Sequence, residues 1–217
     1  EVEIPAVQNS DEDAMKRLQK MIRPFVLRRL KKEVLTDLPD KLDENMFVQL
    51  TGEQQKLYDA HVKRMMLMLD KQSEEEFKTS KITILAELTK LRQICCDPHL
   101  IYENYKGQSA KLDTCMELIL SGVEAGHKIL LFSQFTSMLE LIGARMKKEG
   151  ISYYQLTGET SKEDRLKLVQ AFHKDETPVF LISLKAGGTG LNLTAADMVI
   201  HYDPWWNPAV ESQATDR

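Results

Sequence analysis

A glycine-rich loop between Ser183 and Leu193 has the clearest chemical potential in the chain. Three of its four central positions are glycine, Gly187, Gly188 and Gly190, and the loop directly follows an apolar run. Glycines let backbone N–H groups approach an anion closely, so the loop could hold a phosphate. A dinucleotide fingerprint does not fit because Leu193 stands where the third glycine belongs, and the chain contains no Gly-Lys-Ser/Thr sequence of a Walker A loop. A glycine turn without a ligand is the alternative.

Small polar residues also follow two other apolar runs. Ser133-Gln134 and Thr157-Gly158 occupy such positions, as do Ser183 and Lys185 at the start of the glycine-rich loop. Hydroxyls, amides, helix N-termini and a lysine are the groups that make phosphate contacts. Each group alone could be an ordinary helix cap, but together they suggest a phosphate-bearing polymer along one edge.

Two adjacent tryptophans, Trp205 and Trp206, follow the last apolar run. Paired tryptophans often pack in a core. The alternative is an aromatic group that wedges or stacks against a nucleic acid.

Neither of the possible metal motifs is convincing. Asp11-Glu12-Asp13 resembles an acidic metal-binding box, but the polar stretch before it predicts a solvated helix start instead. The three cysteines, Cys95, Cys96 and Cys115, form no CxxC pair, so we expect buried, reduced thiols in an intracellular protein.

The elements that position these groups change in style near residue 127. Beyond it, short apolar strands alternate with helices, a pattern that predicts βαβ units and a parallel sheet whose ligands bind beyond the carboxyl ends of the strands. The expected strands are Ile129–Phe132, Ile151–Leu156, Val179–Leu184 and Met198–Tyr202. The expected helices are Ser137–Lys148, with a Ser137/Glu140 capping box, Thr160–His173, with a Thr160/Glu163 capping box, and a last one beginning at Pro208.

The first half of the chain is mainly helical in pattern. Helices are expected after Thr51, with Gln54 as its capping-box partner, then over about 84–94, and from Ser109 to Ala125 with Gly126 after its end. A short strand is expected at Met46–Leu50 and a loop or helix end over 70–80. Pro24 is expected to interrupt a helix.

Composition narrows the class of protein. The 217 residues are 42% hydrophobic and 29% charged, which excludes a disordered or low-complexity chain. No apolar stretch of about 18 residues exists, so no membrane span is expected. The net charge of -4 argues against a nucleic-acid partner, yet the window from Ala14 to Leu35 carries eight basic residues and one acidic residue, a net +7.

Several blocks together resemble one family. Ser183–Leu193, Asp203–Pro208 and Gln213–Arg217 are similar to motifs V and VI of the Swi/Snf-type ATP-dependent DNA translocases, the chromatin-remodelling branch of helicase superfamily two. Further similar blocks are Lys128–Phe135, Gln155–Gly158 with Arg165, Arg23–Val34 with Leu38–Lys41, and Leu91–Pro98. The likeness covers nearly the whole chain.

The resemblance implies the second RecA-like motor lobe, an α/β fold with a parallel sheet flanked by helices. It implies a basic segment over 1–45 that leads into the lobe, a first strand and helical protrusion over 46–108, and the RecA-like helicase C-terminal lobe over 109–217, truncated within motif VI. ATP with Mg²⁺ is the implied cofactor, the ion being held mainly by the first lobe. Double-stranded DNA and the first lobe of the same full-length chain are the implied partners, and nucleosomes or other DNA-bound proteins are further candidates.

The resemblance also implies roles for individual residues. Arg217 matches the first finger arginine, which stabilises charge on the transferred phosphoryl group, and a second finger arginine of the family motif would follow it. The implied nucleotide-facing residues are Gly188, Gly190, Asn192 and Gln213. The implied DNA-backbone contacts are Ser133, Gln134, Thr157, Gly158, Ser183, Lys185 and Gly187. Trp206 matches the family tryptophan that approaches the minor groove.

These roles imply a DNA-dependent ATP hydrolase whose second lobe is inactive alone. The absent initiator Met and Arg217 in mid-pattern suggest a piece of a longer, intracellular protein, in the bacterial nucleoid or a eukaryotic nucleus. One alternative is a self-standing DNA- or nucleotide-binding regulatory module. Another is lobe two of a different superfamily-two helicase, such as an RNA helicase. A Rossmann enzyme would need the missing third glycine and an acidic ribose partner.

Overall fold

The computed structural model describes residues 12–26, 42–70, 74–187, 191–207, 209 and 214–215. By its contacts the chain divides into two compact units, Glu1–Met46 and Phe47–Arg217. The division into three segments expected from the sequence stays a prediction. No helix in the described parts is long and apolar enough to cross a membrane.

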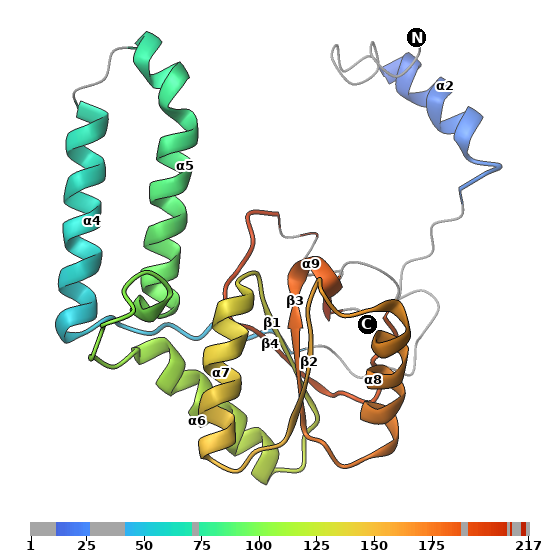
Figure 1. Cartoon of the computed structure of the whole chain (residues 1–217). Coiled ribbons are helices and arrows are strands. Elements are labelled where there is room, and N and C mark those ends of the chain that lie inside the picture. The colour runs from blue at the N-terminus through green and yellow to red at the C-terminus, as the bar shows by residue number, and fades with distance from the viewer. Residues whose placement is uncertain are drawn as a thin grey trace. The chain divides into compact units, whose positions relative to one another are not determined.

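The second unit contains a four-stranded sheet with the order β2-β3-β1-β4 (Figure 1). Its strands are β1 (Ile129–Ser133), β2 (Tyr153–Leu156), β3 (Val179–Ser183) and β4 (Met198–His201). All neighbouring strands run parallel, with Ser133 paired to Ser183 at the carboxyl ends of β1 and β3. The βαβ reading is therefore confirmed, and the strands shift from their expected bounds by at most two residues.

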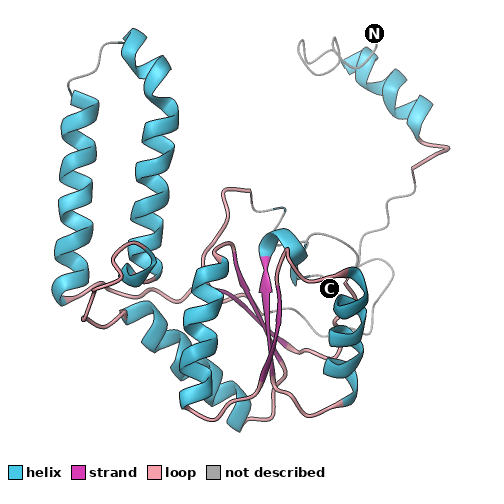
Figure 2. Ribbon diagram, viewed as in Figure 1, coloured by secondary structure: helices cyan, strands magenta, loops and turns pink. Residues whose placement is uncertain are grey.

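Helices cover both faces of this sheet (Figure 2). On one face, α6 (Ala110–Glu124) and α7 (Thr136–Lys148) pack against side chains such as Ile129, Leu131 and Leu181. On the other face, α8 (Lys162–Lys174) contributes Phe172, which packs against Phe180. The central strands β1 and β3 are buried along their whole length, which explains why their sequences are continuous apolar runs.

The capping boxes predicted at Ser137/Glu140 and Thr160/Glu163 do not form. The N-cap of α8 is Ser161, whose hydroxyl accepts the Asp164 N–H, because Thr160 instead accepts the N–H of Thr157 in the preceding turn. Helix α7 begins after Phe135 and has no side-chain cap. Helix α6, expected from Ser109 to Ala125, is capped by Ser109, whose hydroxyl accepts the Leu112 N–H.

A helical hairpin, α4 (Gly52–Asp70) and α5 (Glu74–Cys96), extends from the α/β part as two long helices side by side (Figure 1). Helix α4 begins directly after Thr51, as expected, but Gln54 is not its capping partner: its buried amide bridges the Ile94 carbonyl and the Ala110 N–H. Of the loop or helix end expected over 70–80, Asp70 ends α4, whereas residues 74–80 are helical and 71–73 lie outside the described residues. Residues 42–50 form no strand, which corrects the strand expected at Met46–Leu50.

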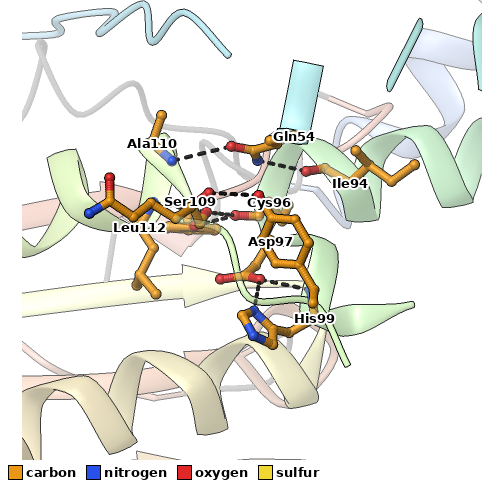
Figure 3. A network of polar contacts seen from close by, with 11 residues as sticks. Gln54, Ile94, Cys96, Asp97, His99, Ser109, Ala110 and Leu112 are labelled. Carbon is orange, nitrogen blue, oxygen red and sulfur yellow. Dashed lines mark hydrogen bonds and ion pairs between the residues drawn. The ribbon is translucent and has the colours of Figure 1, made fainter. Parts of the chain in front are cut away.

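Polar contacts fix the base of this hairpin (Figure 3). Gln54 donates to the Ile94 carbonyl at 2.8 Å, and Ser109 donates to the Cys96 carbonyl at 2.8 Å. Asp97 caps the short 3-10 helix η1 (Pro98–Leu100) by accepting the His99 N–H. Helix α5 ends at Cys96, just before Asp97-Pro98 and two residues beyond the expected end near residue 94.

The three cysteines lie near this base and are free thiols. Cys96 and Cys115 are buried, while Cys95 is half-buried. Burial raises the pKa of Cys96 and of Cys115 to about 12, so both stay protonated at neutral pH.

In the first unit the structure describes one helix, α2 (Glu12–Ile22). Glu12 and Asp13 lie in its first turn, which agrees with a helix start rather than a metal site. The helix ends before Pro24, as expected. Of the basic window from Ala14 to Leu35, residues 14–26 are described and residues 27–35 lie outside the described residues.

Candidate nucleic-acid and nucleotide interface

The carboxyl ends of the four parallel strands bring the candidate loops to one edge of the sheet. Ser133-Gln134 follows β1, Thr157-Gly158 follows β2, and Lys185 follows β3. The tryptophan loop that contains Trp206 follows β4. Because neighbouring strands are parallel, these loops share the edge where open α/β sheets bind ligands.

The two serines at this edge, Ser133 and Ser183, are buried, and their hydroxyls accept hydrogen bonds from backbone N–H groups of the loops that follow. Ser133 Oγ accepts the Phe135 N–H at 3.1 Å, and Ser183 Oγ accepts the Ala186 N–H at 3.3 Å. Both hydroxyls therefore stabilise the turns that leave β1 and β3. Their predicted contact with a DNA backbone stays a prediction.

The Thr157-Gly158 loop offers accessible backbone. Its shape is held by the Thr157 N–H, which donates to Thr160 Oγ1 at 3.1 Å, and by the Glu159 N–H, which donates to Thr157 Oγ1 at 3.4 Å. Gly158 is exposed, and a Cβ placed there would meet nothing within 4 Å. A phosphate could therefore approach this loop without steric hindrance.

A short helix that the sequence did not predict opens the glycine-rich loop. This helix, α9 (Leu184–Gly187), places Lys185 on the surface. Arg165 of α8 donates to the Ala186 carbonyl at 3.0 Å and so connects α8 to α9. An exposed lysine beside a helix at the sheet edge is suited to a phosphate group.

The nucleotide-facing set is only partly described. Gly188, Gly190, Gln213 and the finger candidate Arg217 lie outside the described residues. Asn192 is exposed, and its carbonyl accepts a hydrogen bond from His173 Nε2 at 2.9 Å. This hydrogen bond places Asn192 near the last turn of α8, and a role of its amide at a nucleotide stays a prediction. Within the described residues, no group of three or more His, Cys, Asp or Glu could hold a metal ion.

The tryptophan loop, with Trp205 and Trp206, is exposed and makes contact with an arginine of the helical hairpin. Trp206 is 62% exposed and Trp205 is 38% exposed. The guanidinium carbon of Arg92, near the end of α5, lies 4.9 Å from the ring centroid of Trp206 and 5.7 Å from that of Trp205. These distances are within the range of cation–π contacts.

Arg92 also joins the loops after β1 and β4. It donates to Gln134 Oε1 at 3.2 Å and to the Pro204 carbonyl. The Asp203 carboxylate lies 3.9 Å from the same guanidinium and accepts the backbone N–H of Gln134. Burial raises the pKa of Asp203 above its usual value, while hydrogen bonds from Ser133 and Gln134 oppose that rise.

The sequence did not single out Arg92 or Asp203 as members of this edge. Arg92 is separated from Pro204 by 112 positions, so no local pattern connects them. One signal was available: Arg92 lies within a helix stretch whose neighbours Leu91 and Ile94 are buried, a place where a charged side chain needs a partner.

Two family models match the chain. A SNF2-related domain matches residues 1–100, and a helicase conserved C-terminal domain matches residues 110–217. The chain is 41% identical over 99% of its length to the Bacillus subtilis protein YwqA, which is named as a candidate ATP-dependent helicase/translocase, and covers 24% of that protein. It is 33% identical over 94% of its length to the Saccharomyces cerevisiae nuclear protein STH1/NPS1 and covers 16% of it. The chain thus spans about a quarter or less of these relatives.

Solved structures agree with the sequence relatives. The Sulfolobus solfataricus SWI2/SNF2 ATPase C-terminal domain is 36% identical, with a TM-score of 0.71, over 80% of this chain and 76% of that one. The core of a Sulfolobus solfataricus SWI2/SNF2 ATPase in complex with double-stranded DNA is 35% identical, with a TM-score of 0.72, over 97% of this chain and 45% of that one. By its helicase C-terminal and SNF2-related domains, and by its likeness to most of a solved SWI2/SNF2 C-terminal domain, this chain belongs to the SWI2/SNF2 family of ATP-dependent helicases.

Proposed function

We propose that the chain is the second motor lobe of an ATP-dependent double-stranded DNA translocase. One observation carries the proposal: four loops with phosphate-binding and aromatic groups meet at the carboxyl edge of one RecA-like sheet. The likeness to an ATPase core solved with double-stranded DNA supports duplex DNA as the ligand of that edge.

The DNA side of the edge uses neutral groups and few charges. Gly158 offers exposed backbone, Lys185 offers a cation, and Trp206 offers an exposed indole. Phosphate contacts set the position of a protein on a duplex without reading its sequence, which suits a motor that steps along any sequence. An exposed apolar ring next to these contacts suits the minor groove.

The nucleotide side depends on both lobes. Gly188, Gly190, Asn192 and Gln213 would face ATP, and Arg217 would stabilise the charge that develops on the transferred phosphoryl group. When bound with Mg²⁺, ATP supplies the phosphoryl group whose hydrolysis drives the motor. No Walker A lysine occurs in these 217 residues, so we expect the chain alone to hydrolyse no ATP.

The net charge of -4 bears on the affinity for DNA that we expect of this chain. Because the chain is not basic overall, its grip on DNA rests on a few placed groups, and binding by this lobe alone should be weak and salt-sensitive. Weak binding suits a motor lobe, which must release its track to step. In the complete protein, nucleosomes or other DNA-bound proteins are candidate targets, since one relative is named as a chromatin structure-remodeling complex subunit.

The test measures duplex binding and ATP turnover with the same preparation. We expect duplex DNA to bind with an affinity that falls as salt rises, duplex RNA to compete poorly, and ATP turnover to stay at the blank level with or without DNA. Trp206→Ala should weaken duplex binding, whereas Tyr102→Ala, at another partly exposed aromatic residue, should not. Preference for RNA would favour an RNA helicase lobe. DNA-stimulated hydrolysis by the chain alone would contradict the lobe assignment.

A further inference from the structure

The side chain of Arg92 connects the helical hairpin to the tryptophan loop. It faces both indoles, hydrogen-bonds Gln134 Oε1 and the Pro204 carbonyl, and is only 19% exposed. Arg92 therefore contacts the loops after β1 and β4 at the same time. No other described side chain makes cation–π contacts with either tryptophan.

We propose that Arg92 is a positioning residue that holds Trp205, Trp206 and Gln134 in the arrangement in which this edge meets DNA. The use of that arrangement for DNA rests on the proposed function, whereas the holding itself does not. Through Arg92, the base of the hairpin contacts the exposed aromatic loop that follows β4.

The chemistry of the guanidinium group explains why an arginine stands here. Its planar fork can donate along two directions in its plane, to Gln134 and Pro204, while its flat faces attract the indole rings. A lysine ammonium carries the same charge but is a compact, strongly hydrated point that cannot meet this geometry. Arg92→Lys therefore removes the planar geometry of the side chain and keeps its charge.

The burial of the Arg92 side chain favours a positioning role over direct contact with DNA. Arg92 is mostly covered, and the Asp203 carboxylate lies 3.9 Å from its guanidinium, so much of its charge is compensated within the protein. We expect its effect on DNA to pass through the tryptophans. A residue that itself contacted a phosphate would instead contribute to the salt dependence of binding.

Intrinsic fluorescence gives a direct test, because Trp205 and Trp206 are the only tryptophans of the 217-residue chain. Arg92→Lys should shift the emission to the red and increase quenching by acrylamide, as both indoles lose their contact with the guanidinium. Arg145→Lys is the matched control, since Arg145 pairs with Asp113 and Glu149 on α6 and α7. Arg92→Gln, whose planar amide can keep one hydrogen bond, should give an intermediate change. Unchanged fluorescence in both Arg92 variants with native circular dichroism would overturn the proposal.

The second arm measures binding of an end-labelled DNA duplex over a range of salt concentrations. We expect Arg92→Lys to bind about tenfold more weakly, the loss of cation–π and planar contacts, with the slope of log affinity against log salt unchanged. A wild-type affinity in Arg92→Lys would overturn the positioning role. If the wild-type chain binds no duplex, the proposed function fails, and the fluorescence arm still decides whether Arg92 holds the tryptophans.

Discussion

The carboxylate of Asp203 accepts the backbone N–H of Gln134, at 3.1 Å from Oδ2 and 3.3 Å from Oδ1. This contact joins the loop that follows β4 to the first residue after β1, at the candidate DNA edge. Asp203 is 2% exposed, so its hydrogen bonds are shielded from water. The pair therefore sets where both loops leave the sheet.

Replacing Asp203 by alanine should destabilise the chain. The Asp203→Ala variant leaves the Gln134 N–H without its acceptor and removes the carboxylate beside Arg92. We expect a loss of about 2–3 kcal/mol in the free energy of unfolding, measured by urea titration. Asp113→Ala, at a partly exposed pair with Arg145, should cost less than about 1 kcal/mol. Equal losses in the two variants would contradict this account of Asp203.

The ion pairs that the buried Glu87 makes in the hairpin should make its contribution to stability depend on pH. The side chain is 4% exposed and lies near Lys90, Arg64 and His61, at 2.9, 3.8 and 3.5 Å. The hydrogen bond from Lys90, with help from the nearby charges, lowers the pKa of Glu87 below its usual value of about 4.5, against the opposing effect of burial.

A lowered pKa means that the folded chain binds the proton less readily than the unfolded chain. The stabilisation is therefore complete above about pH 4.5 and is lost as the pH falls through the lower folded value. At pH 7 we expect Glu87→Gln to lose about 1–3 kcal/mol, and the gap from wild type should narrow below pH 4.5. Unfolding curves at several pH values check this, with exposed Glu117→Gln as the control. A gap that widens in acid would refute it.

The hairpin base supplies a third prediction, at Gln54. Gln54 is 1% exposed and its amide bridges the Ile94 carbonyl and the Ala110 N–H, so Gln54→Leu leaves a buried carbonyl and a partly buried N–H unpaired (Figure 3). We expect a loss of about 2–4 kcal/mol in the free energy of unfolding and faster amide exchange in α4 and α5. Gln55→Leu, which removes only an exposed bond to Asp59, should change stability by less than about 0.5 kcal/mol. Similar exchange in both variants would exclude a bridging role.

The periodicity of the apolar residues predicted the sheet and its helices, but the sequence did not predict which residues cap those helices. Both Thr160/Glu163 and Ser161/Asp164 place a hydroxyl three residues before a carboxylate, and the sequence cannot rank them. The turn that binds Thr160 to the Thr157 N–H decides in favour of Ser161. Local signals therefore located the helix to within two residues, but a contact outside it selected the first residue.

The edge of the sheet was predictable, but its internal contacts were not. Parallel strands must bring their carboxyl ends together, so the loops with Gln134, Thr157, Lys185 and Trp206 could be grouped from sequence alone. The contacts of Arg92 with the tryptophans depend on where the helical hairpin lies relative to the sheet. The hairpin is far from the tryptophans in the sequence, so no local pattern predicts these contacts. Ser133 and Ser183 show the same limit, because only the structure reveals that their hydroxyls hold their own turns.

The last prediction concerns Lys185, the exposed cation of α9. If Lys185 contacts a phosphate, Lys185→Ala should weaken duplex binding alike for all sequences and reduce the slope of log affinity against log salt by about one. Lys148→Ala is the matched control, since this exposed lysine lies at the end of α7, at the opposite edge of the sheet. Anisotropy titrations with unrelated duplexes measure both quantities. An unchanged slope with weaker binding would mean that Lys185 shapes the loop rather than contacting DNA, and equal effects of the two variants would point to general electrostatic attraction instead of a placed contact.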